Sequence, residues 1–571
     1  MANGNWDSEV DYLVAGTGAA GLSAAITAKL NGLTTLLVES TDKWGGTTCI
    51  SGGGLWVPAN PVMLRETTDS LTEALVYMEE TIGEPGPFAS RARKLAFLAA
   101  IDGYIRMTAA QGLNWRRSKN YPDYYPDLPG ARVGRVVELR WFNMRKLGGF
   151  QKQSRMAEGL PAAIRNDDVW ELSRAWSSMS GFIRGVRLVL RLILLGVAGM
   201  QARGMGPALA GGLMWVAQKN DVPVWLSSPL SELIVEDGRV VGAVIEHDGK
   251  SLRVRARRGV MLAAGGFARN TAWREKYQGL PGWTAAPAGQ DGSGIQAGID
   301  AGGATAMMDD AWWGAGVPTG EHSTSFILWE RSMPYSLIVD QSGVRYMNES
   351  ESYIDIGHDM ISRNRTVPAI HSWLVTDSRH RRRYLNTFLL GPSGKWTKAN
   401  GAEFEAATLE ELASKIAVDP SALAATVERF NGFAREGVDR DFQRGRTVYD
   451  RYYSDPSVKP NPTLAPLERG PFYAYKVVPS DLGTKGGLIT DEHARVTRDD
   501  GSVIDGLYAS GNATASVMGH TYPGPGATIG PAAIFGYLGA LHAAQQARNP
   551  EAPVAPPFAP WDSADGAIFT S

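Results

Sequence analysis

The chain has 571 residues, of which 44% are hydrophobic and 20% charged, and its formal net charge is -2. This length favours two or three domains, and the small net charge without a long basic run argues against a nucleic-acid-binding protein. Cys49 is the single cysteine, which excludes an internal disulfide framework and cysteine-based metal sites, and the eight histidines are scattered, so we expect no metal.

The sequence contains no segment that resembles an export signal or a membrane-spanning helix. Residues 1–11 are polar and acidic, without the basic and apolar blocks of an export signal. An uncharged apolar run of about 18 residues, which a spanning helix needs, does not occur. We therefore expect a cytoplasmic protein.

The first predicted element is an apolar strand at residues 10–15, which runs directly into the turn Gly16-Thr17-Gly18-Ala19-Ala20-Gly21. An alanine-rich helix follows, and a second apolar run, residues 34–38, ends in Glu39. This order is typical of a dinucleotide-binding unit, in which glycines let the backbone approach a pyrophosphate at a helix N-terminus and the acid binds a ribose hydroxyl. The cofactor-binding residues predicted here are Gly16, Gly18, Ala19, Ala20, Gly21, Glu39 and Ser40.

A loop of small residues, 44–54, comes next in the chain. Such a loop lets a bulky ring system lie against the backbone, and it therefore favours FAD over NAD as the dinucleotide. The residues of this loop that we predict to contact the cofactor are Gly45, Gly46, Thr47, Thr48, Ser51, Gly52 and Gly53.

Residues 182–195 predict an amphipathic helix. Arg184, Arg187 and Arg191 recur at helical spacing on one face, and large aliphatic residues surround the rest. Such a helix can lie in a membrane interface, with its arginines at the lipid headgroups and its aliphatic residues in the acyl layer. We therefore expect a peripheral contact with the inner face of the cell membrane through a helix near residues 182–203. A buried packing helix and an oligomer contact are the alternatives.

Later segments predict more strands of the nucleotide-binding sheet. Apolar runs flank Asp237-Gly238, a strong hairpin signal. Strands are also predicted at residues 260–264 and 506–510, each followed by glycine, and a final helix is predicted from near Gly526 to residue 544. The cofactor contacts predicted in these segments are Ala264, Gly265, Gly266, Gly511, Asn512, Gly526, Thr528 and Ile529.

Because parts of one sheet lie at both ends of the chain, the middle must be an inserted domain. We predict a cofactor-binding domain formed by residues 1–311 and 483–571, and a catalytic domain at residues 312–482. Within the insertion, helices are predicted at residues 408–416, where Thr408 and Glu411 form a capping box, and after Asp419-Pro420. The proline-rich tail from residue 550 is expected to be an extended strap or disordered.

Four further motifs resemble those of the 3-ketosteroid Δ1-dehydrogenases, within the fumarate-reductase-like group of flavoproteins. They are Pro122-Asp123-Tyr124-Tyr125, Arg345-Tyr346-Met347-Asn348-Glu349-Ser350 followed by Tyr353, Asp481-Leu482-Gly483-Thr484-Lys485-Gly486-Gly487-Leu488, and Tyr522-Pro523-Gly524-Pro525-Gly526. The resemblance covers both ends and most of the middle, but residues 131–215 match poorly. It implies an α/β fold, with a glutathione-reductase-type Rossmann FAD-binding domain and an inserted α+β catalytic domain. It also implies FAD, a 3-ketosteroid substrate and an external electron acceptor.

The resemblance assigns catalytic roles to four residues. The Tyr522 hydroxyl and the Gly526 amide would hold the 3-keto oxygen, Tyr353 would take the proton from ring carbon 2, and Tyr124 would hydrogen-bond to that base. Hydride from ring carbon 1 would pass to flavin nitrogen 5. The chemistry is consistent with this, because donors aimed at a ketone oxygen in a dry pocket stabilise developing negative charge. A tyrosine base has an ordinary pKa of about 10, which a hydrogen bond from Tyr124 would lower.

Several alternatives stay open at this point. Tyr121 and Tyr125 lie close to Tyr124 in the sequence and could exchange roles with it, and His520 near Tyr522 could be a general base. The reaction could instead be 4,5-dehydrogenation of a 3-ketosteroid, or conversion of a dicarboxylate as in fumarate reductases, whose sites clamp carboxylates with arginines and histidines. A non-enzymatic flavin-bearing electron carrier is a further alternative.

Overall fold

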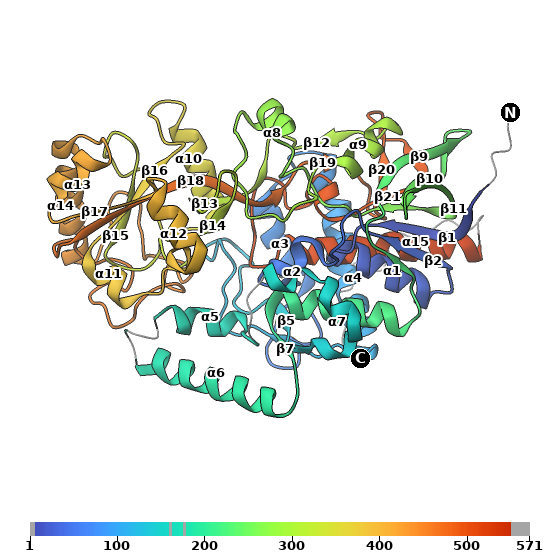
Figure 1. Ribbon diagram of the computed structural model, residues 1–571, viewed down its shortest axis with the longest axis horizontal. Helices are drawn as coiled ribbons and strands as arrows, with labels where there is room; N and C mark the ends of the chain where they lie inside the picture. The colour runs from blue at the N-terminus through green and yellow to red at the C-terminus, as the bar shows by residue number, and fades with distance from the viewer. Residues whose placement is uncertain (1–5, 159–162, 175–176, 178, 550–571) are drawn as a thin grey trace.

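The structure is a computed structural model that describes residues 6–158, 163–174, 177 and 179–549. Two lobes lie side by side along its long axis, and helices α5 (Asn166–Ser173) and α6 (Met179–Val197) lie along one edge of the molecule (Figure 1). The proline-rich tail predicted from residue 550 lies outside the described residues.

Within the described residues, an eight-stranded sheet forms the core of the first lobe, in the order β20-β21-β11-β1-β2-β8 with the β9–β10 hairpin beside β11. Its strands are β1 Ser8–Ala15, β2 Thr35–Val38, β8 Val224–Trp225, β9 Leu230–Glu236, β10 Arg239–His247, β11 Lys250–Leu262, β20 Arg495–Thr497 and β21 Val503–Ala509. Strands β2 and β11 pair in parallel with β1, and β21 pairs in parallel with β11. Both ends of the chain thus contribute to one sheet, and the predicted α/β fold is confirmed.

Positive φ angles explain two local features of this lobe, a hairpin turn and the start of the final helix. Asp237 and Gly238, at φ 49° and 76°, form the predicted hairpin turn between β9 and β10. The final helix, α15 (Ile529–Arg548), begins three residues later than predicted, because Gly526 has a φ of 91°, which an α-helix does not contain.

Helix α15 packs on α1 (Ala19–Leu30), and both helices contact strands of the large sheet. The approach is close because Gly536 faces the backbone of Ala20. A Cβ atom added to Gly536 would lie 2.3 Å from the Ala20 carbonyl oxygen. The alanine-rich composition of α1 thus lets the helix be buried on several sides, as its exposure pattern shows.

In the second lobe, the described residues form a six-stranded antiparallel sheet in the order β14-β13-β18-β16-β15, with β17 also paired to β18. Its strands are β13 Ala311–Pro318, β14 Thr324–Phe326, β15 Ser336–Val339, β16 Ser372–Thr376, β17 Glu403–Ala406 and β18 Phe472–Thr484. The associated helices are α10 Tyr353–Arg363, α11 Ser378–Arg383, α12 Gly391–Ala399, α13 Leu409–Lys415 and α14 Pro420–Glu436. The domain boundaries at residues 311/312 and 482/483 stay a prediction.

The two helices predicted in the insertion are α13 and α14. Thr408 caps α13, because its side chain accepts a hydrogen bond from the Glu411 amide at 3.2 Å. Asp419 caps α14 in the same way, accepting from the Ser421 amide at 3.0 Å. These caps satisfy amides that have no partner within the helix.

The other helices of the described residues are α2 Gly46–Ile50, α3 Leu71–Ile82, α4 Arg91–Ala110, α7 Met205–Lys219, α8 Thr271–Gln278 and α9 Ser293–Asp300. The other strands of these residues are β3 Leu55–Trp56, β4 Trp115–Arg117, β5 Val136–Leu139, β6 Phe142–Asn143, β7 Ala202–Arg203, β12 Thr305–Ala306 and β19 Gly487–Leu488. The 3-10 helices are η1 Pro87–Ala89, η2 Met144–Gln153, η3 Arg155–Glu158, η4 Thr387–Leu389 and η5 Gly511–Ala513. No helix in the described part of the chain combines the length and apolar character needed to cross a bilayer.

Candidate active site

A cavity of about 470 Å³ is lined by residues of both lobes. The predicted site residues that line it are Gly16, Gly18, Ala19, Ala20, Glu39, Ser40, Gly46, Thr47, Thr48, Ser51, Gly52, Gly53, Tyr124, Ala264, Gly265, Tyr353, Gly511, Asn512, Tyr522, Gly526, Thr528 and Ile529. Residues far apart in the chain therefore meet around one space.

Gly21, Gly45 and Gly266 were predicted as cofactor contacts, but they do not line this cavity. A Cβ atom on Gly21 would lie 1.8 Å from the Gly16 carbonyl oxygen, and one on Gly266 would lie 2.0 Å from the Thr484 hydroxyl oxygen. Gly45 has a φ of 106° at the start of α2. These three glycines allow tight packing next to the cavity wall, and their contact with the cofactor stays a prediction.

The turn after β1 forms one end of the cavity. Gly16 has a φ of 110°, and a Cβ atom there would lie 2.2 Å from the Ala263 carbonyl oxygen. Helix α1 begins at Ala19, so its N-terminal amides stand at the cavity wall, an arrangement suited to a pyrophosphate. The buried Glu39 carboxylate at the end of β2 accepts hydrogen bonds from the Thr17 amide and hydroxyl, at 3.2 and 2.5 Å. This end of the cavity fits the nucleotide half of FAD.

The middle of the cavity is bounded by main chain. Gly53, with a φ of 64°, packs so closely on α7 that an added Cβ atom would lie 2.2 Å from the Met205 carbonyl carbon. Gly265 and Ile529, the first residue of α15, line the same cavity. A flat ring system can therefore contact backbone on more than one side, and the residues present fit FAD.

Further lining residues lie outside every motif found in the sequence. They are Val136, Arg155, Asn166, Val169, Met205, Ser228, Pro229, Gln290, Ser293, Phe326, Leu328, Trp329 and Tyr453, among others. Most are single side chains from loops and short helices, which come together only when the lobes pack. Leu482 and Pro525 also line the cavity and lie within predicted motifs, but neither was predicted as a site residue.

Three buried tyrosines, Tyr124, Tyr353 and Tyr522, meet at the other end of the cavity. Ring centroids are 5.4 Å apart for Tyr124 and Tyr353, 5.3 Å for Tyr124 and Tyr522, and 4.9 Å for Tyr353 and Tyr522. Tyr353 is the first residue of α10, whereas the other two lie in loops. The Tyr124 amide donates to the Pro523 carbonyl at 2.9 Å, which joins two of the predicted motifs directly.

The neighbours of Tyr124 lie in different surroundings. The Tyr121 hydroxyl is 2.7 Å from the Tyr453 hydroxyl and 3.4 Å from that of Tyr124. Tyr125 points away from the cavity, because its hydroxyl donates to Asp355 at 3.2 Å. Of these three tyrosines, Tyr124 is the one whose ring contacts both Tyr353 and Tyr522 among the described ring contacts.

Gly526 stands beside Tyr522. Its φ of 91° and the short distance of 2.2 Å between an added Cβ atom and the Gly54 carbonyl oxygen leave no room for a side chain. Burial raises the pKa of Tyr522, while hydrogen bonds from the side chains of Thr528 and Tyr353 and from the Gly526 amide lower it. The Thr528 hydroxyl donates to the Tyr522 oxygen at 3.1 Å. The Tyr522 hydroxyl therefore stays protonated at neutral pH and can donate its hydrogen.

The pKa of Tyr353 is raised well above 10, first by burial and then by Tyr522, while a hydrogen bond from Tyr124 opposes the rise. The predicted lowering by Tyr124 is therefore present, but burial outweighs it. His520, the alternative base, does not line the cavity, and its Nδ1 atom lies 2.9 Å from the Asp310 carboxylate.

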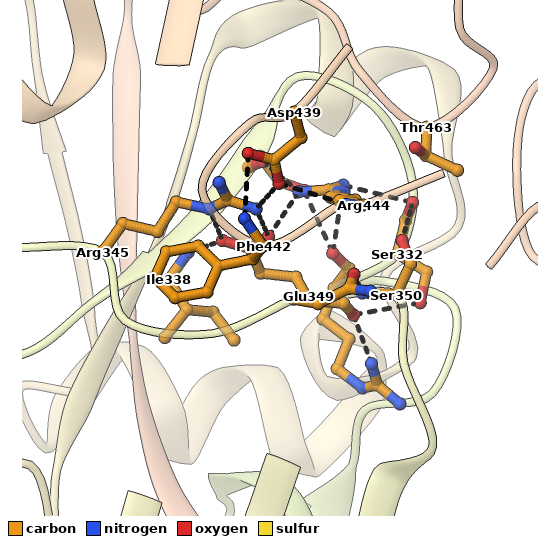
Figure 2. A network of polar contacts seen from close by, with 12 residues as sticks. Ser332, Ile338, Arg345, Glu349, Ser350, Asp439, Phe442, Arg444 and Thr463 are labelled. Atoms are coloured by element: carbon orange, nitrogen blue, oxygen red, sulfur yellow. Dashed lines mark hydrogen bonds and ion pairs between the residues drawn. The ribbon is translucent and has the colours of Figure 1, made fainter. Parts of the chain in front are cut away.

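The motif before Tyr353 forms a buried ion network with the segment after α14, which Figure 2 shows. Glu349 binds Arg345 at 2.8 Å and Arg444 at 3.1 Å, and Arg345 also binds Asp439 at 2.8 Å. All four side chains are buried, so the loss of one would leave a buried charge uncompensated and would destabilise the fold. The network fixes the loop that leads into α10 and thereby the position of Tyr353.

Helix α6 is oriented differently from the prediction. Arg184 and Arg191 point inward and bind the buried Asp168 of α5, at 3.3 and 2.8 Å. Arg184 and Arg191 therefore bind Asp168, and not the lipid headgroups of the prediction, because the buried carboxylate attracts them. Arg187, the third arginine of the predicted face, is exposed, and the membrane contact itself stays a prediction. Apart from Arg187, the exposed face is mainly apolar. Its exposed large side chains are Met179, Phe182, Ile183, Val186, Val189, Leu190, Ile193, Leu194 and Val197.

Comparison with known proteins gives consistent matches over nearly the whole chain. The model of the FAD binding domain family matches residues 11–529. The 3-oxosteroid 1-dehydrogenase of Mycobacterium tuberculosis is 42% identical over 570 residues, which cover 94% of this chain and 99% of that protein. The 4-oxocyclohexanecarboxylate 2-dehydrogenase of Sinomonas cyclohexanicum is 33% identical, covering 95% of this chain and 94% of the relative.

A solved structure is similar as well. The crystal structure of 3-ketosteroid delta1-dehydrogenase from Sterolibacterium denitrificans, in complex with 1,4-androstadiene-3,17-dione, superposes with a TM-score of 0.88. The two chains are 36% identical, and the match covers 94% of this chain and 100% of the other.

Proposed function

Because the chain belongs to the 3-oxosteroid 1-dehydrogenase family of FAD-binding proteins, we propose that it introduces a double bond between carbons 1 and 2 of a 3-ketosteroid. The observation that carries the proposal is the convergence of Tyr124, Tyr353 and Tyr522 beside Gly526, in the cavity whose other end fits a dinucleotide. Bound FAD supplies a two-electron acceptor for the hydride from carbon 1, and an external electron acceptor must then reoxidise it.

In the proposed mechanism the tyrosines divide the proton chemistry. Tyr522 and the Gly526 amide donate hydrogen bonds to the ketone oxygen, which makes the neighbouring carbon 2 more acidic. Tyr353 accepts the proton from carbon 2. The Tyr124 hydroxyl donates a hydrogen bond to the Tyr353 oxygen. Thr528 orients the Tyr522 hydroxyl, since it donates to that oxygen at 3.1 Å.

The composition of the cavity supports a steroid over a carboxylate substrate. Among its described lining residues, Arg155 is the one lysine or arginine, and it contacts Thr41 near the nucleotide end. A dicarboxylate or a 4-oxocyclohexanecarboxylate would be held most strongly by cationic side chains that pair with its carboxylate groups. The apolar lining residues on the substrate side are Val136, Val169, Met205, Phe326, Leu328, Trp329, Leu482 and Pro525.

A substrate panel tests the function. With an artificial electron acceptor, we expect turnover of androst-4-ene-3,17-dione and cholest-4-en-3-one, with a new 1,2 double bond identified by product analysis. Succinate and 4-oxocyclohexanecarboxylate should give no turnover above background. A 4,5 double bond formed from a saturated 3-ketosteroid, without 1,2-dehydrogenation, would instead establish the runner-up reaction.

The rate of FAD reduction should depend on pH. Because the pKa of Tyr353 is raised well above 10, the ionised base is a small fraction at neutral pH and grows as pH rises. We expect the reduction rate at saturating steroid to increase by up to about tenfold per pH unit between pH 7 and 9. Stopped-flow absorbance measures this rate, and a profile that is flat over this interval would exclude Tyr353 as the titrating base.

We also propose that the apolar face of α6 contacts a membrane surface. Leu194 and Val197 are 68% and 83% exposed, and they belong to a contiguous apolar patch. Such a patch marks an interaction site, whereas isolated exposed apolar residues do not. Exposed basic residues lie on and beside this helix. Arg187 of α6 is exposed, and the exposed Arg145 of η2 lies beside Gly199, just past the end of α6. An apolar face with a basic rim suits an anionic lipid surface, from which a steroid could reach the cavity behind α5.

A vesicle sedimentation assay tests the membrane contact. Wild-type protein should sediment with vesicles that contain phosphatidylglycerol, and Leu190→Glu combined with Leu194→Glu should abolish this while activity on a soluble steroid remains. The matched control is Val438→Glu with Val448→Glu, which changes two exposed apolar residues outside α6. Sedimentation of the α6 variant at the wild-type level would remove the proposal.

A further inference from the structure

We infer that Lys485 is a positioning residue for the proposed reaction: its buried ammonium group holds the loop that carries Tyr522 and places a positive charge behind the hydroxyl that binds the ketone. This inference rests on the proposed function. It concerns a side chain outside the cavity wall, since Lys485 is not among the residues that line the main cavity.

The contacts of Lys485 point to the Tyr522 loop. Lys485 directly follows β18 and has no exposed surface. Its Nζ atom donates to the Thr521 carbonyl at 2.6 Å, one residue before Tyr522. The same ammonium group lies 4.3 Å from the ring centroid of Trp312, whose ring meets that of Tyr522 edge to face at 5.0 Å. The lysine thus supports Tyr522 through the main chain and through an aromatic ring.

The charge of Lys485 is only partly compensated. Among the described residues, no carboxylate lies within ion-pair distance of its Nζ atom. The nearby carboxylates have other partners: Asp310 binds His358 and His520 at 2.9 Å each, and Asp355 accepts from Tyr125. Burial lowers the pKa of Lys485 to about 8, opposed by these two carboxylates, so the side chain stays largely charged at neutral pH.

A second route connects the charge to Tyr522. A small cavity of about 20 Å³ is lined by both Lys485 and Thr528, and it has room for one water molecule. Thr528 is the residue whose hydroxyl donates to the Tyr522 oxygen. The positive charge therefore shares a small cavity with the side chain that donates to the Tyr522 oxygen.

This placement favours the transition state over the bound substrate. A buried ammonium group with a single hydrogen-bond acceptor among the described residues is costly to bury. Its field is strong there because the surroundings screen it weakly. A neutral ketone gains little from that field, whereas a ketone oxygen that becomes negative gains much more. Lys485 should therefore affect kcat more than KM.

Two substitutions separate the effect of the Lys485 charge from the effect of its hydrogen bond to the Thr521 carbonyl. Lys485→Met removes the charge and the hydrogen bond, and Lys485→Gln keeps a donor for the Thr521 carbonyl without the charge. We expect both to lower kcat by about 10- to 100-fold, in the range of a hydrogen bond to a charged group, with KM changed by less than about threefold. Lys485→Arg should restore part of the rate. The control is Lys476→Met. Lys476 lies on β18, the strand that Lys485 directly follows, and its ammonium group also lies over a tryptophan ring, 5.8 Å from Trp373 and outside the cavity.

The decisive readout is the ionisation of a bound phenol. A steroid with a phenolic ring A, such as estradiol, carries an oxygen at position 3 that becomes negative when it ionises, and its ultraviolet spectrum reports that change. In FAD-loaded enzyme, both charge-removing substitutions should raise the pKa of the bound phenol by about one unit or more relative to wild type. An unchanged phenol pKa in Lys485→Gln, even with a lower kcat, would overturn the inference, because a loop distortion alone does not remove a charge. Failure of the wild-type enzyme to oxidise any 3-ketosteroid would refute the proposed function instead.

Discussion

Replacing Tyr353 with phenylalanine is expected to slow the reduction of bound FAD by a 3-ketosteroid by about 10²- to 10⁴-fold, the range in which a positioned general base contributes. The ring would still fill its place among Tyr124, Tyr522 and Phe326, so steroid binding should change little. Single-turnover stopped-flow absorbance separates the two effects, because it measures binding and reduction in one experiment.

Tyr449 offers a matched control for this substitution. Its ring lies 4.5 Å from that of Tyr124, and its buried hydroxyl has no hydrogen-bond partner among the described residues. Tyr449→Phe therefore removes the same atom from the same aromatic cluster, and we expect a rate within about threefold of wild type. If Tyr353→Phe also stays within that range, the base must be another group.

Replacing Tyr522 with phenylalanine is expected to lower kcat by about 10²- to 10³-fold, as the loss of one oxyanion-binding donor does in other enzymes. The effect should be smaller than that of Tyr353, because the Gly526 amide would remain as a second donor. The Tyr522 hydroxyl also receives the hydrogen bond from Thr528, so the substitution would leave the Thr528 hydroxyl without that partner.

Steady-state kinetics on androst-4-ene-3,17-dione measure this loss, and the phenolic steroid gives a second readout. Its pKa in the complex should rise in Tyr522→Phe because the donor to its oxygen is gone. Tyr277→Phe, in α8 of the first lobe, is the control, since the Tyr277 ring packs on Trp273 away from the cavity. Unaltered turnover in Tyr522→Phe would show that the ketone is held elsewhere.

The buried ion network of Figure 2 holds in place the segments that carry the site tyrosines. It joins the loop before Tyr353 to the segment that follows α14, through Arg345 with Asp439 and Arg444 with Glu349. That segment also contributes Tyr453, whose hydroxyl meets Tyr121 at 2.7 Å. Because breaking a buried ion pair leaves an uncompensated charge, the site geometry depends on residues that never touch the cavity.

The sequence by itself determined the elements whose signals are local. The strand, glycine turn and helix at residues 8–30 were predictable, because the pyrophosphate-binding turn restricts backbone conformation within a few residues. The hairpin at Asp237-Gly238 and the capped starts of α13 and α14 were predictable for the same reason. FAD as the cofactor and the three tyrosines as candidates followed from motifs that lie in short, continuous segments.

Only the tertiary structure decided the features that depend on long-range contacts. Tyr124 is distinguished from Tyr121 and Tyr125 by the rings that reach it from residues 353 and 522. Helix α6 turns two arginines inward because Asp168 on another helix is buried and negative. Burial, and not the hydrogen bond from Tyr124, sets the direction of the Tyr353 pKa shift. Burial and charge compensation are properties of the packed chain, and a one-dimensional pattern does not contain them.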